Sequence, residues 1–316
     1  MSEPLISVII PAYNAEKTLG AAISSALTQT YPHLEIVVCD DGSTDATSAI
    51  ATSYGDRVRL VRQDNAGVAA ARNAAIAAST GELCALLDAD DILLPGHVSR
   101  CLRLWRDAGG GRRLVTANAL YLTHDGIAPR RRLIPRPIPA REQRLRVMEH
   151  PFVTGFALFP RSMADELGGF DTTLRTAEDY DFWLRAVFHG WEVLFQMEPQ
   201  ALYRRGPGSL STELTQMQGD GSAVLRKLSL DADVRLTEEE RRDLDRRLAS
   251  DPVLAYIERG ERALLAGDRR AAATEFAAAS RLWPSNAGLT RKALLLRVPF
   301  TGAALTRLQE RRHRQT

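Results

Sequence analysis

Three acidic segments follow one another along the chain, and their residue types could support the transfer of a negatively charged group. Carboxylates that gather in one site repel one another, so such a site usually also holds a cation. A carboxylate can also take the proton from an attacking hydroxyl. Each segment alone is equally typical of a turn or a helix cap, so its place in the fold must decide between these interpretations. The segments are Asp40-Asp41, Asp88-Ala89-Asp90-Asp91, and Glu178-Asp179 with Asp181.

The apolar pattern around the first two segments predicts strands that alternate with helices. Such alternation is typical of βαβ units and a parallel sheet. The acidic residues then follow directly after strands, at the carboxyl edge where open α/β sheets bind ligands. If the strand ends between Asp88 and Asp90, both carboxylates point to the same side. We expect strands at 5–10, 34–39, 58–61 and 83–87, and helices at 15–28, 44–53 and 67–78.

After Asp91 the pattern is less regular. Pro95 opens a predicted helix, and the third acidic segment begins another at 178–188. We expect strands at 114–122, 156–159 and 193–195. Residues 124–140 are rich in Pro and Arg, which predicts a surface loop.

Beyond Tyr203 the pattern is purely helical. Thr237 with Glu240 predicts a capping box. Residues 251–286 have the alanine spacing and the central Gly267-Asp268 turn of one tetratricopeptide-like helix pair. A single pair cannot bury its own apolar face, so we expect it to dock on the rest of the chain, with a partner-binding module as the alternative.

Composition places the 316 residues among ordinary globular proteins, with 45% hydrophobic and 25% charged residues. A net charge of +2 gives no reason to expect nucleic acid as a partner. The cysteines, Cys39, Cys84 and Cys101, lack metal-binding spacing and indicate a reducing compartment. The apolar run at 5–10 is too short to span a membrane. We therefore expect a cytoplasmic protein.

Arginines crowd two stretches of the chain. They could form a solvated surface, or they could contact an anionic acceptor such as a diphosphate-linked lipid or an acidic sugar chain. Peripheral contact with the inner membrane face is the related expectation. The residues are Arg130, Arg131, Arg132, Arg136, Arg141, Arg144 and Arg146 in one stretch, and Arg307, Arg311, Arg312 and Arg314 in the tail.

Taken together and in this order, the motifs resemble the family 2 glycosyltransferases over residues 5–211. The nucleotide-binding half is matched by Ser7 to Asn14, Asp40 to Asp45, Asn65-Ala66-Gly67 and Ala71-Arg72-Asn73, and the Asp-x-Asp motif by Leu87 to Asp91. The acceptor half is matched by Gly168 to Asp171, Glu178 to Asp181 and Tyr203-Arg204. The resemblance implies an α/β protein of GT-A fold, in which helices flank a mixed, Rossmann-like sheet. It also implies a donor half at 1–107 and an acceptor half at 108–210. The all-helical appendage at 211–316 lies outside the resemblance and is predicted from the helical pattern alone.

The resemblance implies a role for each matching residue. Asp179 would be the general base, and Mn²⁺ or Mg²⁺ would be held by Asp90 with Asp88. The donor-binding residues would be Pro11, Ala12 and Tyr13 around the base, Asp41 accepting a hydrogen bond from it, and Arg72 near the nucleotide. Asp88 would lie by the ribose or the diphosphate, and Ala89 and Asp90 complete the donor-binding set. The acceptor-side candidates are Glu178, Asp181 and Trp183, although the helical placement of Trp183 favours the core. Relatives often carry a His where this chain has Gly206, and His150 or His189 could replace it.

The implied activity is that of an inverting, metal-dependent hexosyltransferase acting in polysaccharide biosynthesis. It would move a sugar from a nucleotide-diphosphate sugar, with UDP-sugars as the first expectation, to a hydroxyl of a glycan or lipid-linked glycan. A sugar nucleotidyltransferase is one alternative, but it needs a Gly-rich basic loop where this chain has Pro11 to Asn14. A non-catalytic nucleotide-sugar-binding scaffold is the other. The sugar, the acceptor, the linkage and the oligomeric state stay open.

Overall fold

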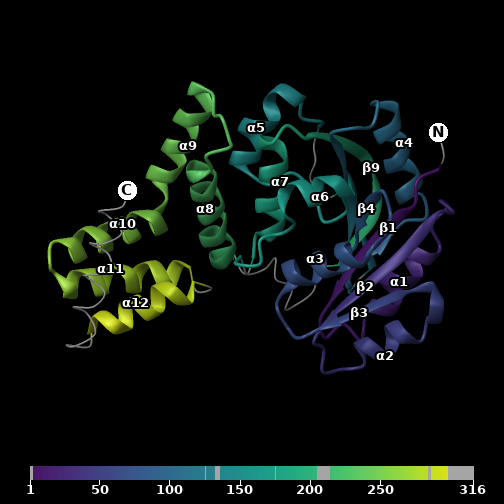
Figure 1. Cartoon of the computed structure of the whole chain (residues 1–316), viewed down its shortest axis with the longest axis horizontal. Helices are drawn as coiled ribbons and strands as arrows, with labels where there is room; N and C mark the ends of the chain where they lie inside the picture. Colours follow the sequence, from purple (N-terminus) through teal and green to yellow (C-terminus); the bar gives the residue numbers. More distant parts are fainter. Residues whose placement is uncertain are drawn as a thin grey trace. The chain divides into compact units, whose positions relative to one another are not determined.

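The computed structural model describes residues 3–124, 126–131, 136–174, 176–204, 214–283 and 286–297. The chain forms two compact units, Met1–Ser209 and Leu210–Thr316 (Figure 1). Among the helices of these residues, none is long and apolar enough to cross a membrane.

One mixed sheet organises the first unit. Within the described residues nine strands join it in the order β3-β2-β1-β4-β8-β6-β9-β5, with β7 paired to β6. Strands β1 to β4 run parallel, whereas β8 runs antiparallel to both β4 and β6. The strands are β1 (Ile6–Ala12), β2 (Leu34–Asp41), β3 (Arg59–Gln63), β4 (Leu83–Leu86), β5 (Ile92–Leu93), β6 (Arg113–Thr123), β7 (Gly126–Arg131), β8 (Leu158–Pro160) and β9 (Glu192–Arg204). The expected mixed sheet is therefore present.

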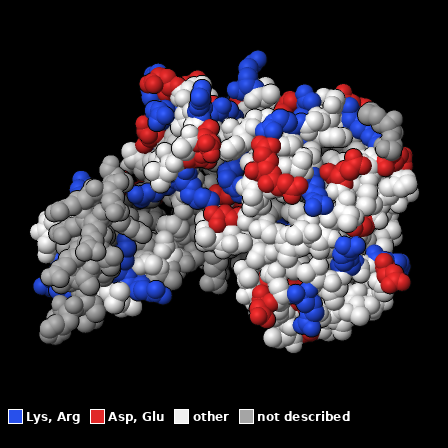
Figure 2. Space-filling view, in the orientation of Figure 1, with Lys and Arg blue, Asp and Glu red and all other residues white. Residues whose placement is uncertain are grey.

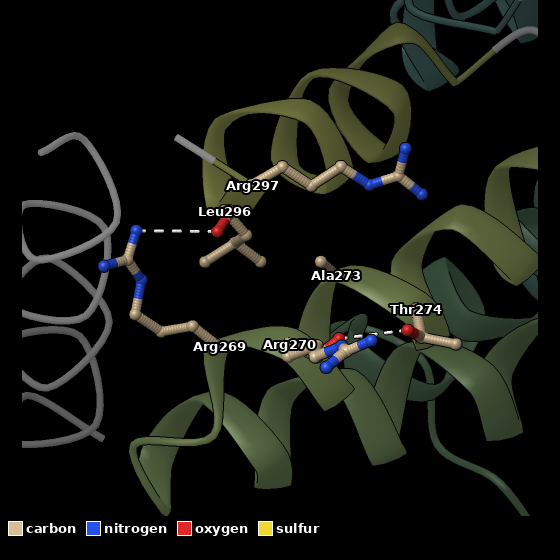
Figure 3. A pocket seen from close by; sticks show the side chains of 6 residues that line it. All are labelled: Arg269, Arg270, Ala273, Thr274, Leu296 and Arg297. Atoms are coloured by element: carbon tan, nitrogen blue, oxygen red, sulfur yellow. Dashed lines mark hydrogen bonds between the residues drawn. The ribbon is translucent and has the colours of Figure 1, made fainter. Parts of the chain in front are cut away.

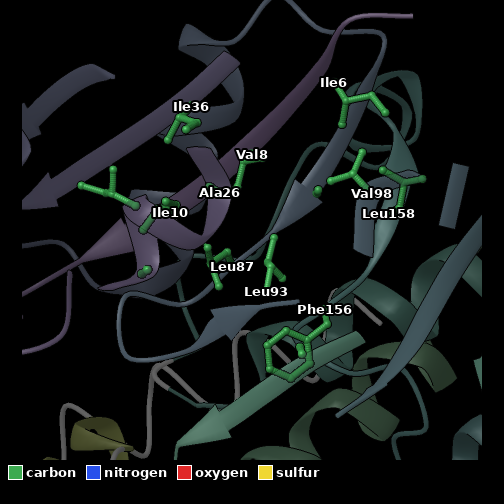
Figure 4. Close-up of a cluster of buried hydrophobic side chains, with 14 of the residues drawn as sticks. Ile6, Val8, Ile10, Ala26, Ile36, Leu87, Leu93, Val98, Phe156 and Leu158 are labelled. Atoms are coloured by element: carbon green, nitrogen blue, oxygen red, sulfur yellow. The ribbon is translucent and has the colours of Figure 1, made fainter. Parts of the chain in front are cut away.

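Helices flank this sheet, and alternate residues of each strand face opposite sides. On one side, Val8 and Ile10 of β1 share a buried apolar cluster with Ala26 of α1, Val98 of α4 and Leu158 of β8 (Figure 4). The helices of the first unit are α1 (Leu19–Leu27), α2 (Thr47–Thr52), α3 (Val68–Ala78), α4 (His97–Asp107), α5 (Ala140–Glu149), α6 (Arg161–Leu167) and α7 (Glu178–Phe188).

Aromatic rings pack behind the other side of β8. Phe159, the neighbour of Leu158 in the strand, lies edge-on to Phe182 and Trp183 of α7. The ring of Phe170 stacks on that of Phe182, with 4.2 Å between centroids. This cluster anchors α7 under the sheet, so the first turn of α7 is held in a fixed position.

Several elements differ from the sequence-based expectation. Part of the predicted loop at 124–140 forms β7, which pairs with β6 as a hairpin. The short strand expected at 193–195 extends to 13 residues in β9, because β6 pairs with it along most of its length. Helix α7 begins at Glu178 and ends at Phe188, as predicted.

The second unit is helical, as expected. Its helices are α8 (Leu214–Leu230), α9 (Glu238–Ser250), α10 (Pro252–Leu265), α11 (Arg269–Leu282) and α12 (Ala287–Arg297). The capping box is present: Thr237 Oγ1 accepts from Glu240 N at 3.2 Å, and Thr237 N donates to Glu240 Oε2 at 2.8 Å. The predicted helix pair is α10 and α11, and α12 adds Leu289, Ala293 and Leu296 to their apolar core. A third helix thus buries part of the face that a lone pair would leave open.

Candidate functional site

The first part of the candidate site is the turn after β1. Pro11 and Ala12 are buried, whereas the ring of Tyr13 is 51% exposed at the carboxyl edge of the sheet. Asn14 has a φ of 47°, which Asn tolerates better than most residues. Its side-chain Oδ1 accepts a hydrogen bond from Thr44 N at 2.9 Å, which ties this turn to the loop after β2.

Asp41, the last residue of β2, is 3% exposed and holds the start of α3. Its carboxylate accepts hydrogen bonds from Gln63 Nε2 at 2.7 Å, Ala66 N at 2.9 Å and Gly67 N at 2.8 Å. Because a carboxylate accepts about four hydrogen bonds, one further donor can still bind. Asp41 therefore has an observed structural role, and its contact with a nucleotide base stays a prediction.

The neighbouring Asp40 is fully buried and has a structural role. Its Oδ1 accepts a hydrogen bond from Ser43 N at 2.9 Å, and Arg62 Nε lies 3.3 Å from its Oδ2. Burial alone would raise the pKa of Asp40, but the hydrogen bonds and the Arg62 charge lower it below the ordinary value. Asp40 therefore stays ionised inside the sheet edge.

The second acidic segment forms a turn and does not continue the strand. β4 ends at Leu86, and Asp91 N donates to Asp88 O at 3.0 Å. The strand thus ends within one residue of the predicted end at 87, and the condition that it end between Asp88 and Asp90 is not met. The turn, rather than strand alternation, sets where the two carboxylates lie. The end of β9 holds this turn, since Arg204 N donates to Asp91 Oδ1 and Arg204 Nε to Asp90 O, both at 2.7 Å.

Arg72 of α3 joins the second acidic segment to the third. The guanidinium is 5% exposed; Nη2 donates to Asp88 Oδ1 at 2.8 Å and Nη1 to Glu178 Oε1 at 2.6 Å. Its Cζ lies 5.4 Å from the centroid of the Phe170 ring. Burial alone would lower the pKa of Arg72, but the carboxylates of Asp88, Glu178 and Asp179 outweigh burial and raise it. Arg72 is therefore a permanent cation between two acids. The motif match placed it near the nucleotide but did not predict this bridge.

The next residue, Asn73, fixes the loop that carries Phe170. Asn73 Nδ2 donates to Phe170 O, and Phe170 N donates to Asn73 Oδ1, both at 2.8 Å. Gly169 has a φ of 76°, and a Cβ on it would lie 2.5 Å from Asn73 Oδ1. Only Gly fits there, which gives the Gly-Gly-Phe motif a physical reason.

The first turn of α7 carries the third acidic segment. Ala177 caps it with a φ of 61°, and Glu178 is 7% exposed, whereas Asp179 is half-buried. Asp179 Oδ1 accepts from Tyr180 N at 2.7 Å. A carboxylate in the first turn is favoured by the helix dipole. Asp179 is thus the accessible acid of this pair.

Two acceptor-side candidates are buried in the structure, as the helical placement of Trp183 predicted for that residue. Asp181 is buried and pairs with Arg185 at 2.7 Å, and Arg185 in turn donates to Leu167 O and Gly169 O. Trp183 is 1% exposed within the aromatic cluster. Both side chains therefore support the fold and cannot reach an acceptor.

Burial and neighbouring negative charges raise the pKa of two acids in this region. Burial, followed by the Asp88 charge, raises the pKa of Asp90 above its ordinary value, even though the side chain reaches solvent. Burial also raises the pKa of Glu178; Arg72 acts in the opposite direction, and Asp179 adds to the rise. The arrangement is short of positive charge, which a cation would supply.

The pair Asp88 and Asp90 fits a hard divalent cation that brings other ligands with it. Among the described residues no group of three or more His, Cys, Asp or Glu could enclose a metal. Mg²⁺ and ions like it need only one or two carboxylates when substrate phosphates and waters complete the shell. Asp88 uses Oδ1 for Arg72, and beside Oδ2 lies Gly155, where a Cβ would come within 3.2 Å. Since position 155 has no Cβ against Oδ2 and the Asp88 side chain is 31% exposed, the donor set fits.

Other predicted features lie apart from this cluster or outside the described residues. Gly206 and the tail arginines are outside them, as are the side chains of Arg130, Arg131 and Arg132. On α5, Arg144 lies 4.6 Å from the Phe188 ring centroid, and Arg146 pairs with Glu149 at 2.7 Å. Neither His150 nor His189 joins a group of three possible metal ligands, since the described chain has none.

The second unit carries a hollow of about 530 Å³ between α11 and α12 (Figure 3). Its lining holds three arginines and no carboxylate, so it offers no ligand for a divalent cation. The lining residues are Arg269, Arg270, Ala273, Thr274, Leu296 and Arg297. On the face that Figure 2 shows, acidic and basic side chains lie in small groups of both signs.

Comparison with known proteins shows which family this chain resembles in sequence. A family model for glycosyl transferase family 2 matches residues 7–168. An uncharacterized glycosyltransferase of Rickettsia bellii is 30% identical over 244 residues, which cover 72% of this chain and 34% of that protein. The chondroitin synthase of Escherichia coli is 34% identical over 189 residues, which cover 58% of this chain and 26% of that protein. The chain thus spans a minor part of the length of both relatives.

Two solved structures share the fold. S. aureus TarS 1–349 in complex with UDP-GlcNAc has a TM-score of 0.62 at 17% identity, covering 92% of this chain and 90% of that one. The mannosyltransferase PcManGT from Pyrobaculum calidifontis, in complex with GDP-Man and Mn²⁺, has a TM-score of 0.60 at 20% identity, covering 98% and 85%.

The adjacent glycines 168 and 169 provide a matched test of the Asn73 contact. Both have positive φ, but a Cβ on Gly168 would meet nothing within 4 Å. Gly168→Ala should therefore cost only the left-handed backbone, about 1–2 kcal/mol of unfolding free energy. Gly169→Ala should cost about 2 kcal/mol more, because it also displaces the two Asn73 hydrogen bonds. Urea unfolding measures both, and equal losses would show that the Asn73 contact contributes nothing.

We expect the ionised carboxylate of Asp90 to lower the unfolding free energy of the ligand-free protein. Because its folded pKa is raised, the ionised carboxylate destabilises the ligand-free fold at neutral pH, and this cost vanishes as the pH falls below about 3.9, the ordinary Asp value. Asp90→Asn should therefore raise the unfolding free energy at pH 7, with a gain that shrinks toward pH 4. Asp88→Asn is the matched control: it loses the Arg72 ion pair and should lower stability by about 2 kcal/mol. Destabilisation by Asp90→Asn at pH 7 would contradict this assignment.

Proposed function

Because the chain belongs to glycosyl transferase family 2 and has the GT-A fold, we propose that it is an inverting, metal-dependent glycosyltransferase. It takes a hexose from a nucleotide-diphosphate sugar, with UDP-sugars as the first donor class. The acceptor is a hydroxyl of a glycan or lipid-linked glycan in polysaccharide biosynthesis. The relation to a chondroitin synthase and the UDP-GlcNAc bound by TarS support this choice.

The observation that carries the proposal is the bridge Asp88–Arg72–Glu178. It sets the acidic turn after β4 beside the first turn of α7, although 106 residues separate Arg72 from Glu178 in sequence. A transferase needs a leaving-group site and a base on the two sides of one sugar. The bridge supports this arrangement, because Asp88 and Asp90 belong to the first side and Asp179 to the second.

On the donor side, Tyr13 is the exposed ring that can lie against a base, and Asp41 has room to accept one hydrogen bond. Asp88 and Asp90 would hold Mn²⁺ or Mg²⁺. When bound, the cation neutralises negative charge that develops on the departing nucleoside diphosphate. The Mn²⁺ complex of PcManGT supports this assignment.

On the acceptor side, Asp179 takes the proton from the attacking hydroxyl. The neighbouring Glu178 is unsuited to this role, because it is buried and bonded to Arg72. Direct attack from the face opposite the leaving group inverts the anomeric centre, so no covalent intermediate is needed.

The alternatives fit less well. A sugar nucleotidyltransferase would need a Gly-rich basic loop after β1, and this chain has Pro11 to Asn14. A non-catalytic scaffold would leave the accessible Asp179 beside the acidic turn without a purpose. The free, buried cysteines suit a reducing compartment, and we keep a cytoplasmic location, peripheral to the inner membrane face, as part of the proposal.

A donor screen tests the activity. Purified chain is incubated with UDP-, GDP- and other nucleotide sugars and Mn²⁺, with candidate glycan acceptors, and release of nucleoside diphosphate is measured. We expect release with one donor class, its loss when EDTA removes the metal, and its loss in Asp90→Asn. Release that EDTA leaves unchanged would overturn the metal assignment, and release of pyrophosphate from a nucleoside triphosphate would favour the nucleotidyltransferase.

Asp179→Asn tests the base. The amide keeps the size of the side chain but takes no proton, so turnover should fall by about two to four orders of magnitude. Donor affinity, measured by titration on the same preparation, should change little. Asp181→Asn is the control, because its carboxylate faces Arg185 and should not affect the chemical step. Near-normal turnover in Asp179→Asn would remove Asp179 from this role, and loss of donor binding would assign it to the donor side.

A further inference from the structure

Glu178 is a buried acid that the reaction proposed above does not use. Its carboxylate is 7% exposed and bonded to Arg72 at 2.6 Å, so it neither accepts the acceptor's proton nor reaches a substrate. Burying an ion pair costs desolvation free energy that its attraction often fails to recover. Its presence at the start of α7 therefore needs a different explanation.

Arg72 divides one positive charge between two carboxylates. Two different nitrogens of its guanidinium contact Asp88 and Glu178, at 2.8 and 2.6 Å, and its Cζ lies over the Phe170 ring, 5.4 Å from the centroid. The fork geometry of Arg allows such a double contact, whereas the single ammonium of Lys does not. Because one cation faces two carboxylates, the three groups together carry a net negative charge, and the charge of Asp88 is only partly compensated.

We propose that Glu178 is a positioning residue which, through Arg72, sets how strongly Asp88 binds a divalent cation on the donor side. The inference rests on the proposed function for the metal at Asp88 and Asp90. Asp88 binds Arg72 through Oδ1, whereas its Oδ2 meets no Cβ from position 155 and the side chain is 31% exposed. The cation and Arg72 therefore compete for one carboxylate.

The direction of the effect follows from Coulomb's law. Without the charge of Glu178, Arg72 would be attracted to Asp88 alone, and a second cation near Asp88 would meet stronger repulsion. Linkage makes the effect reciprocal: a cation bound at Asp88 strengthens the hold of Arg72 on Glu178, and so on the turn that carries Asp179. A cation bound on the donor side would then hold Asp179, the proposed base, more firmly in position.

The test is a titration of the full chain with Mn²⁺, alone and with UDP, followed by the electron paramagnetic resonance signal of free Mn²⁺. Glu178→Gln keeps the shape and can still accept from Arg72, yet it should weaken Mn²⁺ binding about tenfold, within the usual range of coupling between sites. Asp181→Asn removes the same charge from the same helix turn but from a partner of Arg185, so it should change the affinity less than about twofold.

The same substitution made in an Arg72→Lys variant tests whether the effect of Glu178 passes through Arg72. In Arg72→Lys, the substitution Glu178→Gln should change Mn²⁺ affinity by a much smaller factor, because the fork is gone. Circular dichroism melts confirm that each variant is folded. Arg72→Lys keeps the test open if Glu178→Gln alone unfolds, because a Lys that pairs with Asp88 alone should also weaken Mn²⁺ binding in the same titration.

The outcomes separate the two proposals. Equal weakening by Glu178→Gln and Asp181→Asn would reveal a general charge effect and overturn the inference, as would an undiminished Glu178→Gln effect in Arg72→Lys. Normal Mn²⁺ binding in Glu178→Gln would overturn it while leaving the metal-dependent transferase intact. A parent chain that binds no Mn²⁺ would overturn the metal assignment and the inference together.

Discussion

The buried guanidinium of Arg72 is the group on which the candidate site depends. A charge so deep in protein requires close carboxylates, and here they come from the turn after β4 and from the first turn of α7. Neither acid alone would hold these segments together. The same contact thus unites the part of the sheet that would hold the donor with the helix that carries the accessible Asp179.

The surroundings of Arg72 give up stability to keep this geometry. Ala177, just before Glu178, has a positive φ that is strained for a residue with a Cβ, whereas Gly169 adopts its left-handed backbone without that cost and lets Asn73 hold the Phe170 loop. The pKa values of Asp90 and Glu178 are raised because burial and like charges disfavour their ionised forms. Strain and poorly compensated charge in one place are typical of sites kept for function rather than for stability.

The second unit is stabilised by apolar packing between its helices and by hydrogen bonds at the helix ends. Its helices bury alanines, Leu264, Phe276 and Leu296 in a core of their own, and its caps are local hydrogen bonds. Gly260 lets the Phe276 ring approach the α10 backbone, since a Cβ there would lie 3.0 Å from it. The hollow among the described residues of this unit is lined by arginines and by no carboxylate, unlike the candidate site of the first unit.

The sequence by itself determined the features that depend on neighbours along the chain. The alternation of strands and helices, the bounds of α7, the capping box at Thr237 and the α10–α11 pair are written in local spacing, and the ordered motifs were enough to indicate the family. Only the tertiary structure decided which distant residues meet. The Arg72 bridge, the Asn73 contact with Phe170, and the pairing of β6 with both β7 and β9 join segments up to 106 residues apart. The burial of Asp181 and Trp183 is likewise set by the packing around α7. Local patterns specify an element's type and face, but a long-range pair depends on sheet order and on the packing of helices against it, which no single segment encodes.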